Sequence, residues 1–197
     1  MSNINISSSA VLIDVSISVW TGRKLDRKVS EEIDGAKRTK TRAGNYNKNL
    51  LAGSDELKSI AQLAGEIRNW HYARTLAWSD SGTRLLPTAQ FFEYKQGIAA
   101  FQLEFEHRVK NFLDAYPVTV SAAAFTMGDL FDRSEYPDAS EIANKFKFIY
   151  TISPVPEAGD FRVDVSNDAM RELALEYETA YSARVNDAMQ SVWDKVH

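Results

Sequence analysis

The first regular pattern along the chain is an alternation of apolar and polar residues at positions 10–20. A period of two that is rich in β-branched residues predicts a half-buried strand with one apolar face. The residues of that face are Val11, Ile13, Val15, Ile17 and Val19. Thr21 and Gly22 end the strand, and the next segment has apolar residues for only one short helix, at Leu25, Val29 and Ile33. We expect a mobile loop after it, around 39–49.

Two longer stretches place apolar residues alternately three and four positions apart, which predicts two amphipathic helices. Ser54 is a suitable N-cap for the first helix, and Pro87 lies where the second begins. These positions are apolar except at His71, Arg74 and Arg108. The first seam is Leu57, Ile60, Ala64, Ile67, His71, Arg74 and Trp78; the second is Phe91, Tyr94, Ile98, Phe101, Phe105, Arg108 and Phe112. Because the helices match in length and phase and a short connection joins them, they predict an antiparallel hairpin.

The remaining sequence predicts shorter elements and one more long helix. Pro117 and Pro137 should each end a helix and open a short one, near 118–132 and near 139–145, the latter capped by Asp138. Residues 146–153 alternate again and predict a strand whose apolar face is Phe146, Phe148, Tyr150 and Ile152. Residues 161–165 predict a returning hairpin strand. A final helix is expected from about 166 to 197.

These elements together predict an α+β fold that is mainly helical. A long antiparallel helical hairpin and a C-terminal helix should pack with a small antiparallel sheet. The length of 197 residues suits one domain with a sizeable core. We therefore expect a single domain over 1–197 that contains a basic segment at 21–53, part of it mobile.

The distribution of charge changes this picture. The whole chain carries 23 basic and 27 acidic residues, a formal net charge of −4. Residues 21–48 alone hold nine basic and four acidic residues, a net charge of +5, so the remaining sequence has a net charge of −9. The nine basic residues are Arg23, Lys24, Arg27, Lys28, Lys37, Arg38, Lys40, Arg42 and Lys48.

This basic segment has two interpretations. Lysines and arginines that neutralise phosphates give sequence-independent affinity for nucleic acid, and Tyr46 among asparagines could stack on a base. The ten candidate binding residues are therefore the nine basic ones and Tyr46. The alternative is a solvated loop, or an arm that docks on acidic protein surface of its own or a neighbouring subunit.

Composition and missing motifs exclude several classes of protein. The chain has no cysteine, which excludes disulfide scaffolds, thiol nucleophiles, iron–sulfur clusters and thiolate zinc sites. It also lacks the glycine-rich phosphate loops, the H-E-x-x-H motif and the G-x-S-x-G elbow. No cofactor is expected. The polar N-terminus and the lack of a long apolar run predict a cytoplasmic protein without membrane association.

Three groups of polar residues could have a chemical role, but each also has a simpler structural explanation. Glu104 and His107 have di-iron spacing but no second copy, so they indicate a surface pair. The acidic run Asp129, Asp132, Glu135, Asp138 and Glu141 could collect a divalent cation, although a solvated face with helix caps accounts for it better. His71, Arg74 and Arg108 could pair with carboxylates, or be a satisfied histidine and two snorkelling arginines. No metal site is assigned.

Several blocks of the sequence together resemble a family of uncharacterised proteins from tailed phages and integrative conjugative elements. The blocks are LID at 12–14, WTGRK at 20–24, GDLFD at 128–132, YP at 136–137, PVP at 154–156 and GDFRV at 159–163. Genes of that family often lie near a MoxR-type AAA+ ATPase or recombination functions. The resemblance implies an accessory protein in the host cytoplasm, with an AAA+ ATPase as a candidate partner, and it carries no activity.

The sequence thus supports two functional hypotheses that are not enzymatic. In the first, a phage or mobile-element accessory protein self-assembles into a homo-oligomer through its helices and acts on a protein partner. In the second, the segment 23–48 binds single- or double-stranded DNA during recombination or replication. A third hypothesis, an enzyme that uses the acidic run with a divalent ion, has less support.

Overall fold

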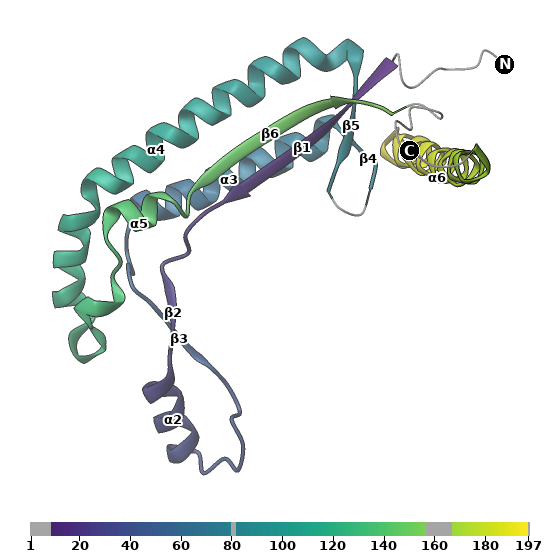
Figure 1. Cartoon of the computed structure of the whole chain (residues 1–197). Helices are drawn as coiled ribbons and strands as arrows, with labels where there is room; N and C mark the ends of the chain where they lie inside the picture. The colour runs from purple at the N-terminus through teal and green to yellow at the C-terminus, as the bar shows by residue number, and fades with distance from the viewer. Residues whose placement is uncertain (1–8, 80–81, 157–166, 197) are drawn as a thin grey trace. The chain divides into compact units, whose positions relative to one another are not determined.

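The computed structural model describes residues 9–79, 82–156 and 167–196 and has the predicted α+β fold (Figure 1). The chain forms two compact units. Of the described residues, the first unit contains 9–17, 66–102, 148–156 and 167–196, and the second contains 18–65 and 103–147. Two long helices, α3 (Asp55–Arg74) and α4 (Phe91–Thr126), each contribute residues to both units.

A four-stranded sheet with the order β4-β5-β1-β6 organises the first unit. Its strands are β1 (Ala10–Ser18), β4 (Leu76–Ala77), β5 (Arg84–Pro87) and β6 (Lys147–Pro154). Leu12 pairs with Leu85, and both belong to a buried cluster with Trp78, Val155 and Ala188. Since neighbouring residues of a strand point to opposite faces, Ile13 and Leu86 bury the other face.

The predicted strands 10–20 and 146–153 are confirmed as β1 and β6. In β6 the buried positions are Phe146, just before the strand, and Phe148, while Tyr150 and Ile152 are half-buried, so the predicted apolar face is correct. In β1 both Leu12 and Ile13 are buried, because this end of the sheet is covered on both faces. The predicted strand 161–165 lies outside the described residues.

The antiparallel helical hairpin is confirmed, with one correction at its connection. Trp70 of α3 contacts Tyr94 and Phe101 of α4, and nearer the other end Arg108 donates to the Ser59 carbonyl. Helix α3 ends at Arg74, however, and not after Trp78. The connection forms the hairpin β4–β5 and a 3-10 turn, η1 (Thr88–Gln90), because Leu85 and Leu86 pair with β1.

The predicted helix break at Pro117 is wrong, since α4 continues through Pro117 to Thr126. Proline inside a helix removes one hydrogen bond and disfavours the helical conformation of the residue before it, at a cost of about 3 kcal/mol. Here that residue, Tyr116, is buried against Trp20 and Phe112, and its hydroxyl donates to the Pro137 carbonyl at 2.9 Å. These contacts hold Tyr116 in the helix. No separate helix therefore starts at 118.

The C-terminal helix α6 (Asn167–Val196) matches its prediction and covers the sheet of the first unit. Tyr181, Val185 and Ala188 pack on the cluster around Trp78, and Tyr177 donates to the Pro156 carbonyl at 2.7 Å. Among the described residues, no helix is long and apolar enough to cross a membrane.

The second unit contains six short elements besides its parts of α3 and α4. They are β2 (Arg23–Asp26), α2 (Arg27–Ala36), β3 (Tyr46–Asn49), η2 (Gly128–Leu130), η3 (Arg133–Glu135) and α5 (Ala139–Ala143). The expected short helix in the basic segment is α2, and the helix expected near 139–145 is α5. Asp138 takes its N-cap position, but the Asp138 side chain makes no capping hydrogen bond, so that part of the prediction is wrong. The expected loop 39–49 is only partly a loop, because 46–49 form β3.

Candidate nucleic-acid interface

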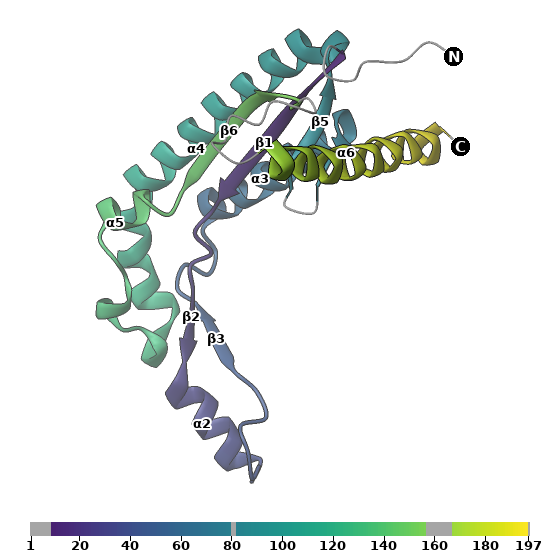
Figure 2. The ribbon, with the colours of Figure 1, turned by 45° about the vertical axis from the view of Figure 1, so that its right-hand side comes forward.

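The basic segment folds into one defined element, the basic arm, which we define as residues 23–49. Strands β2 and β3 pair antiparallel, with Arg23 opposite Asn49 and Asp26 opposite Tyr46. Helix α2 follows β2 without a linker. Figures 1 and 2 show α2 at the far end of this two-stranded ribbon. The arm thus has a base at 23–24 and 48–49 and a tip beyond the ribbon.

Two short side chains explain why the chain turns directly from β2 into α2. Asp26 is the N-cap of α2, and its carboxylate accepts from the Val29 amide at 3.1 Å. Ser30 is buried; its hydroxyl donates to the Asp26 carbonyl at 2.6 Å and accepts from the Tyr46 amide at 2.9 Å. Ser30 therefore joins the helix to the returning strand.

A third side chain holds the loop that follows α2. The Asp34 carboxylate accepts from the Ala43 amide at 3.3 Å, and the Asp34 carbonyl accepts from the amide and the hydroxyl of Thr39. Arg38 takes a left-handed conformation with φ of 52°, which lets the chain reverse there. Residues 37–42, with the sequence KRTKTR, form the turn at the tip, and we call them the tip loop.

At the base, one lysine is used to anchor the arm. Lys48 is 5% exposed; its ammonium group contacts the carboxylates of Asp26, at 3.1 Å, and Glu135, and it donates to the Leu130 carbonyl at 3.0 Å. Burial alone would lower the pKa of Lys48, but its bonds to Glu135 and Asp26 outweigh burial and raise it. The bonds from the Val29 amide and Lys48 lower the pKa of Asp26. Lys48 therefore stays charged and paired.

A tyrosine strengthens the same anchor. Tyr136 is buried, and its hydroxyl donates to the Leu50 carbonyl at 2.9 Å. Burial raises the pKa of Tyr136, so the hydroxyl keeps its proton and remains a donor. The base of the arm is thus fixed to residues 130–136 by both charge and hydrogen bonds.

The structure separates the ten candidate residues into two groups. The first group lies at the base of the arm: Lys48 is buried there, and Lys24 lies 3.8 Å from Glu135. Among the nine basic candidates, those that are exposed and have no carboxylate within 4.0 Å in the described part of the chain are Arg23, Arg27, Lys28, Lys37, Arg38 and Lys40. Arg42 is exposed too and lies 3.8 Å from Glu31. The available positive charge is therefore concentrated on α2 and the tip loop.

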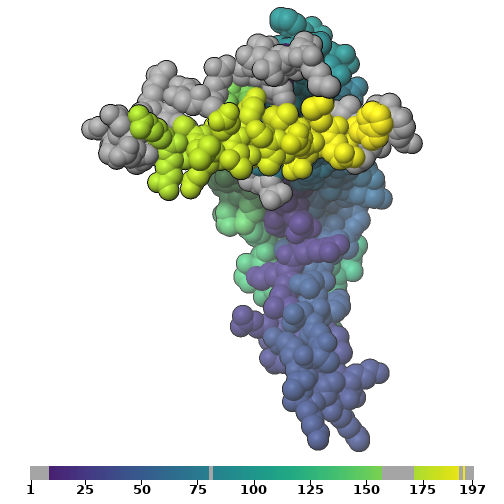
Figure 3. Space-filling model, turned by 90° about the vertical axis from the view of Figure 1, so that its right-hand side faces the viewer, coloured from purple at the N-terminus to yellow at the C-terminus, as the bar shows by residue number. Residues whose placement is uncertain are grey.

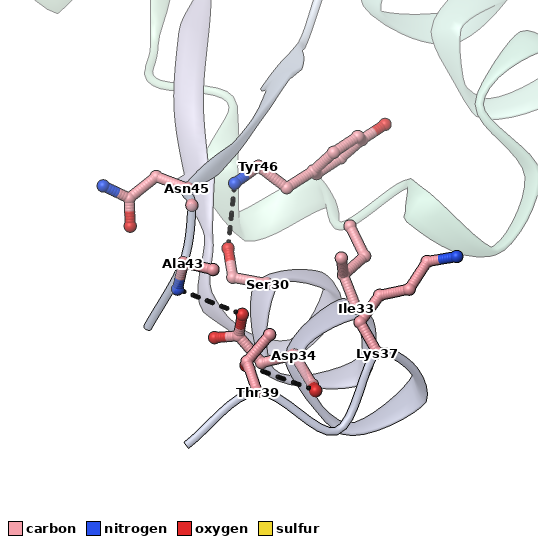
Figure 4. Close-up of a pocket in the computed structure, with 9 residues that line it drawn as sticks. Ser30, Ile33, Asp34, Lys37, Thr39, Ala43, Asn45 and Tyr46 are labelled. Carbon is pink, nitrogen blue, oxygen red and sulfur yellow. Dashed lines mark hydrogen bonds between the residues drawn. The ribbon is translucent and has the colours of Figure 1, made fainter. Parts of the chain in front are cut away.

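The tenth candidate, Tyr46, lines a cavity of about 290 Å³ on the arm. Figure 4 shows the Tyr46 ring and the side chains of Ile33 and Lys37 together on one side of the loop. Asp34, Thr39 and Asn45 line the other side. Sequence reasoning named Tyr46 as a binding residue but did not name Ile33, Asp34 or Ser30 in that role. An aspartate directly before the helix, Asp26, is a local signal that could have located the turn. Only the paired ribbon brings Ile33 beside Tyr46.

Several of the other sequence candidates have structural partners. Glu135 belongs to the anchor, the Asp132 carboxylate caps η3 through Ser134, and Glu141 lies 3.7 Å from Lys145. No group of three or more His, Cys, Asp or Glu side chains in the described ranges could hold a metal ion. Glu104 accepts from Arg108 at 2.7 Å, and His107 contacts Asn111.

His71 is the centre of a buried polar network in the first unit. Its Nδ1 shares a hydrogen bond of 2.7 Å with the Tyr94 hydroxyl, and its carbonyl accepts from Thr75. Arg84 in turn donates to the hydroxyl and the carbonyl of Thr75. Burial, with the charge of Arg84, lowers the pKa of His71 to about 4, so it is neutral at pH 7. Arg74 lies over the Trp70 ring at 4.6 Å. His71 is therefore a buried histidine whose Nδ1 atom has a hydrogen-bond partner, Tyr94.

No protein-family model matches the chain, and no curated protein or solved structure shows significant similarity to it.

Proposed function

We propose that this protein binds nucleic acid through its basic arm. The observation that carries the proposal is the separation of charge along the arm: Lys48 at the base is buried and paired with two carboxylates, whereas Lys37, Arg38 and Lys40 at the tip are exposed and have no carboxylate within 4.0 Å in the described part of the chain. Paired cations would have to break an ion pair to reach a phosphate, but Lys37, Arg38 and Lys40 are available as they stand. Such cations release counterions from a nucleic-acid backbone, which gives affinity without sequence preference.

The order of the tip loop supports the same function. Asp34 of α2 accepts hydrogen bonds from Thr39, within the tip loop, and from Ala43, directly after it, so the four cations of the tip loop are presented on a supported turn. Less conformational entropy is then lost when they contact a partner. The resemblance to proteins of phages and integrative elements is consistent with a DNA partner, and it makes an accessory role in recombination or replication the context of the proposal.

Binding of labelled DNA, measured by fluorescence anisotropy over a salt series, tests the proposal. Changing Lys37, Arg38, Lys40 and Arg42 together to Ala should weaken binding at least 10-fold at low salt. It should also reduce the slope of log affinity against log salt by about 3, since each lost phosphate contact removes about 0.7 to 0.9.

A matched variant controls for net charge. Lys58, Lys95, Lys110 and Lys147 are exposed and lie outside the arm, and changing these four to Ala removes the same charge. That variant should bind as the wild type does. No binding of wild-type protein to single- or double-stranded DNA at low salt, or equal losses in the two variants, would contradict the proposal. In the first case an acidic protein surface becomes the better partner for the arm.

Self-assembly is the second candidate, and α6 favours it. Leu175, Met189 and Trp193 are 67%, 59% and 62% exposed. At 100° per residue they lie within about 40° of one another on the helix, beside the face of Tyr181, Val185 and Ala188 that packs on the sheet. Figure 3 shows α6, in yellow-green to yellow, along the surface turned to the viewer. A second copy of α6 would bury such a stripe in a symmetric helix pair, and a light-scattering mass above 22.2 kDa would support this.

A further inference from the structure

The cavity at Tyr46 has the composition of a site for a planar ring. Tyr46 is half-buried and Ile33 is 47% exposed, so an apolar surface on the arm remains open to a ligand. Lys37 borders this surface with a cation. Gly44 has no atom within 4 Å of the position its Cβ would take, which leaves one wall of the cavity open.

The size of the cavity narrows the choice of ligand. A volume of about 290 Å³ is at the lower end of the range for ligand pockets, which suits one aromatic ring system better than a larger molecule. The surroundings narrow it further. The cavity is lined by part of the tip loop, whose cations favour a ring attached to a chain of negative charges. A nucleotide base within a strand fits both conditions.

We propose that this cavity receives one unpaired base of a single-stranded nucleic acid, stacked on the Tyr46 ring beside Ile33. This inference rests on the proposed function, because the tip loop would hold the phosphates on either side of the base. In a duplex the faces of each base are covered by its neighbours, whereas a base in a single strand can turn outward and stack on an aromatic side chain.

The ligand class of the arm is therefore single-stranded nucleic acid. Both a duplex and a single strand offer phosphates to the tip loop. Only a single strand offers an unpaired base to the Tyr46 cavity. Lys37 lines the cavity and belongs to the tip loop, so one residue links the two contacts. The arm should prefer single strands.

Three oligonucleotides of equal length test this with the full-length wild-type protein: a single strand, the duplex, and a single strand whose sugars carry no bases. The intact single strand should bind on the order of 10-fold more tightly than the abasic strand, which keeps the phosphates and loses only stacking. Tyr46→Ala should lower affinity for the intact strand to that for the abasic strand, and Tyr46→Phe, which keeps the ring, should bind as wild type does.

The outcomes distinguish this inference from the proposed function. If the intact and abasic strands bind wild-type protein equally and the tip-loop variant still loses affinity, the base site is wrong and phosphate binding stands. If no oligonucleotide binds at low salt, the proposed function itself is wrong. The comparison of strands uses unaltered protein, so it decides the question even if Tyr46→Ala disturbs β3.

Discussion

At the scale of single residues, Gly97 shows how closely α4 approaches Trp70. A Cβ added to Gly97 would overlap the six-membered ring of Trp70. The Trp70 side chain cannot move aside easily. The ring centroids of Tyr94 and Phe101 lie 4.9 and 5.3 Å from that of Trp70, and the guanidinium carbon of Arg74 lies 4.6 Å from the Trp70 ring centroid. Only glycine therefore fits at position 97, although glycine is a poor helix former.

We predict that Gly97→Ala lowers the free energy of unfolding by about 1–3 kcal/mol, because the clash with Trp70 exceeds the gain in helix propensity. Gly65 of α3 is the matched control, since nothing lies within 4 Å of its Cβ position. Gly65→Ala should raise the free energy of unfolding by about 0.5–1 kcal/mol. Urea denaturation of both variants checks the pair, and a stabilised Gly97→Ala protein would contradict the packing.

His71 predicts a specific dependence of stability on pH. The pKa of His71 is about 4 in the folded protein and near its ordinary value of 6.5 in the unfolded chain. Between these values the unfolded chain binds more protons, so stability rises with pH across that window and is lost as pH falls through it. The loss from pH 7 to pH 4 should reach up to about 3 kcal/mol.

Denaturation curves at several pH values measure this effect. A His71→Gln variant, which has no group to protonate there, should show a flatter dependence of unfolding free energy on pH between 4 and 6.5. His107 is exposed, and His107→Gln should behave as the wild type does. Identical pH slopes for the wild type and His71→Gln would show that His71 is not buried as a neutral side chain.

At the scale of elements, Lys48 and Lys24 are cross-strand partners with opposite roles. Lys48 is 5% exposed within the anchor, while the Lys24 side chain is 48% exposed and has one weak ion pair. Removing Lys48 would leave the Asp26 and Glu135 carboxylates close together without their shared cation. The same change at Lys24 would remove only an exposed charge.

We predict that Lys48→Met destabilises the second unit by about 3 kcal/mol, as expected when one partner of a buried ion pair is lost. Lys24→Met, its matched control, should cost under about 1 kcal/mol. Thermal denaturation gives the global effect, and faster hydrogen exchange at the amides of β3 would localise it to the arm. Equal and small effects of the two changes would mean that Lys48 does not anchor the ribbon.

Sequence reasoning succeeded for elements whose pattern is local. The alternation in β1 and β6 and the helical spacing of α3, α4 and α6 each extend over several residues that pack on one side. It failed for β4–β5 and β2–β3, which are two to four residues long and exist because they pair with other segments. It also failed at Pro117, where the buried contacts of Tyr116 outweigh the local cost of proline.

At the scale of the whole molecule, α6 gives a prediction about assembly. If a second copy covers the stripe of Leu175, Met189 and Trp193, then changing Leu175 and Met189 to Glu should shift light-scattering masses toward that of one chain. Ala180 and Ala183 are exposed on another side of α6, so the same change at those positions should leave the mass unaltered. A wild-type protein that is monomeric across micromolar concentrations would contradict self-assembly.

The sequence alone determined the class of fold, the long helices, the main strands and the excess of positive charge at 21–48, because periodicity, composition and charge are properties of neighbouring residues. The tertiary structure decided which of those charges are available. Lys48 is neutralised by Glu135, which lies far from it in the sequence, and Tyr46 acquires a cavity only because Ser30 joins β3 to α2. A partner that comes from a distant segment is visible only once the chain has folded.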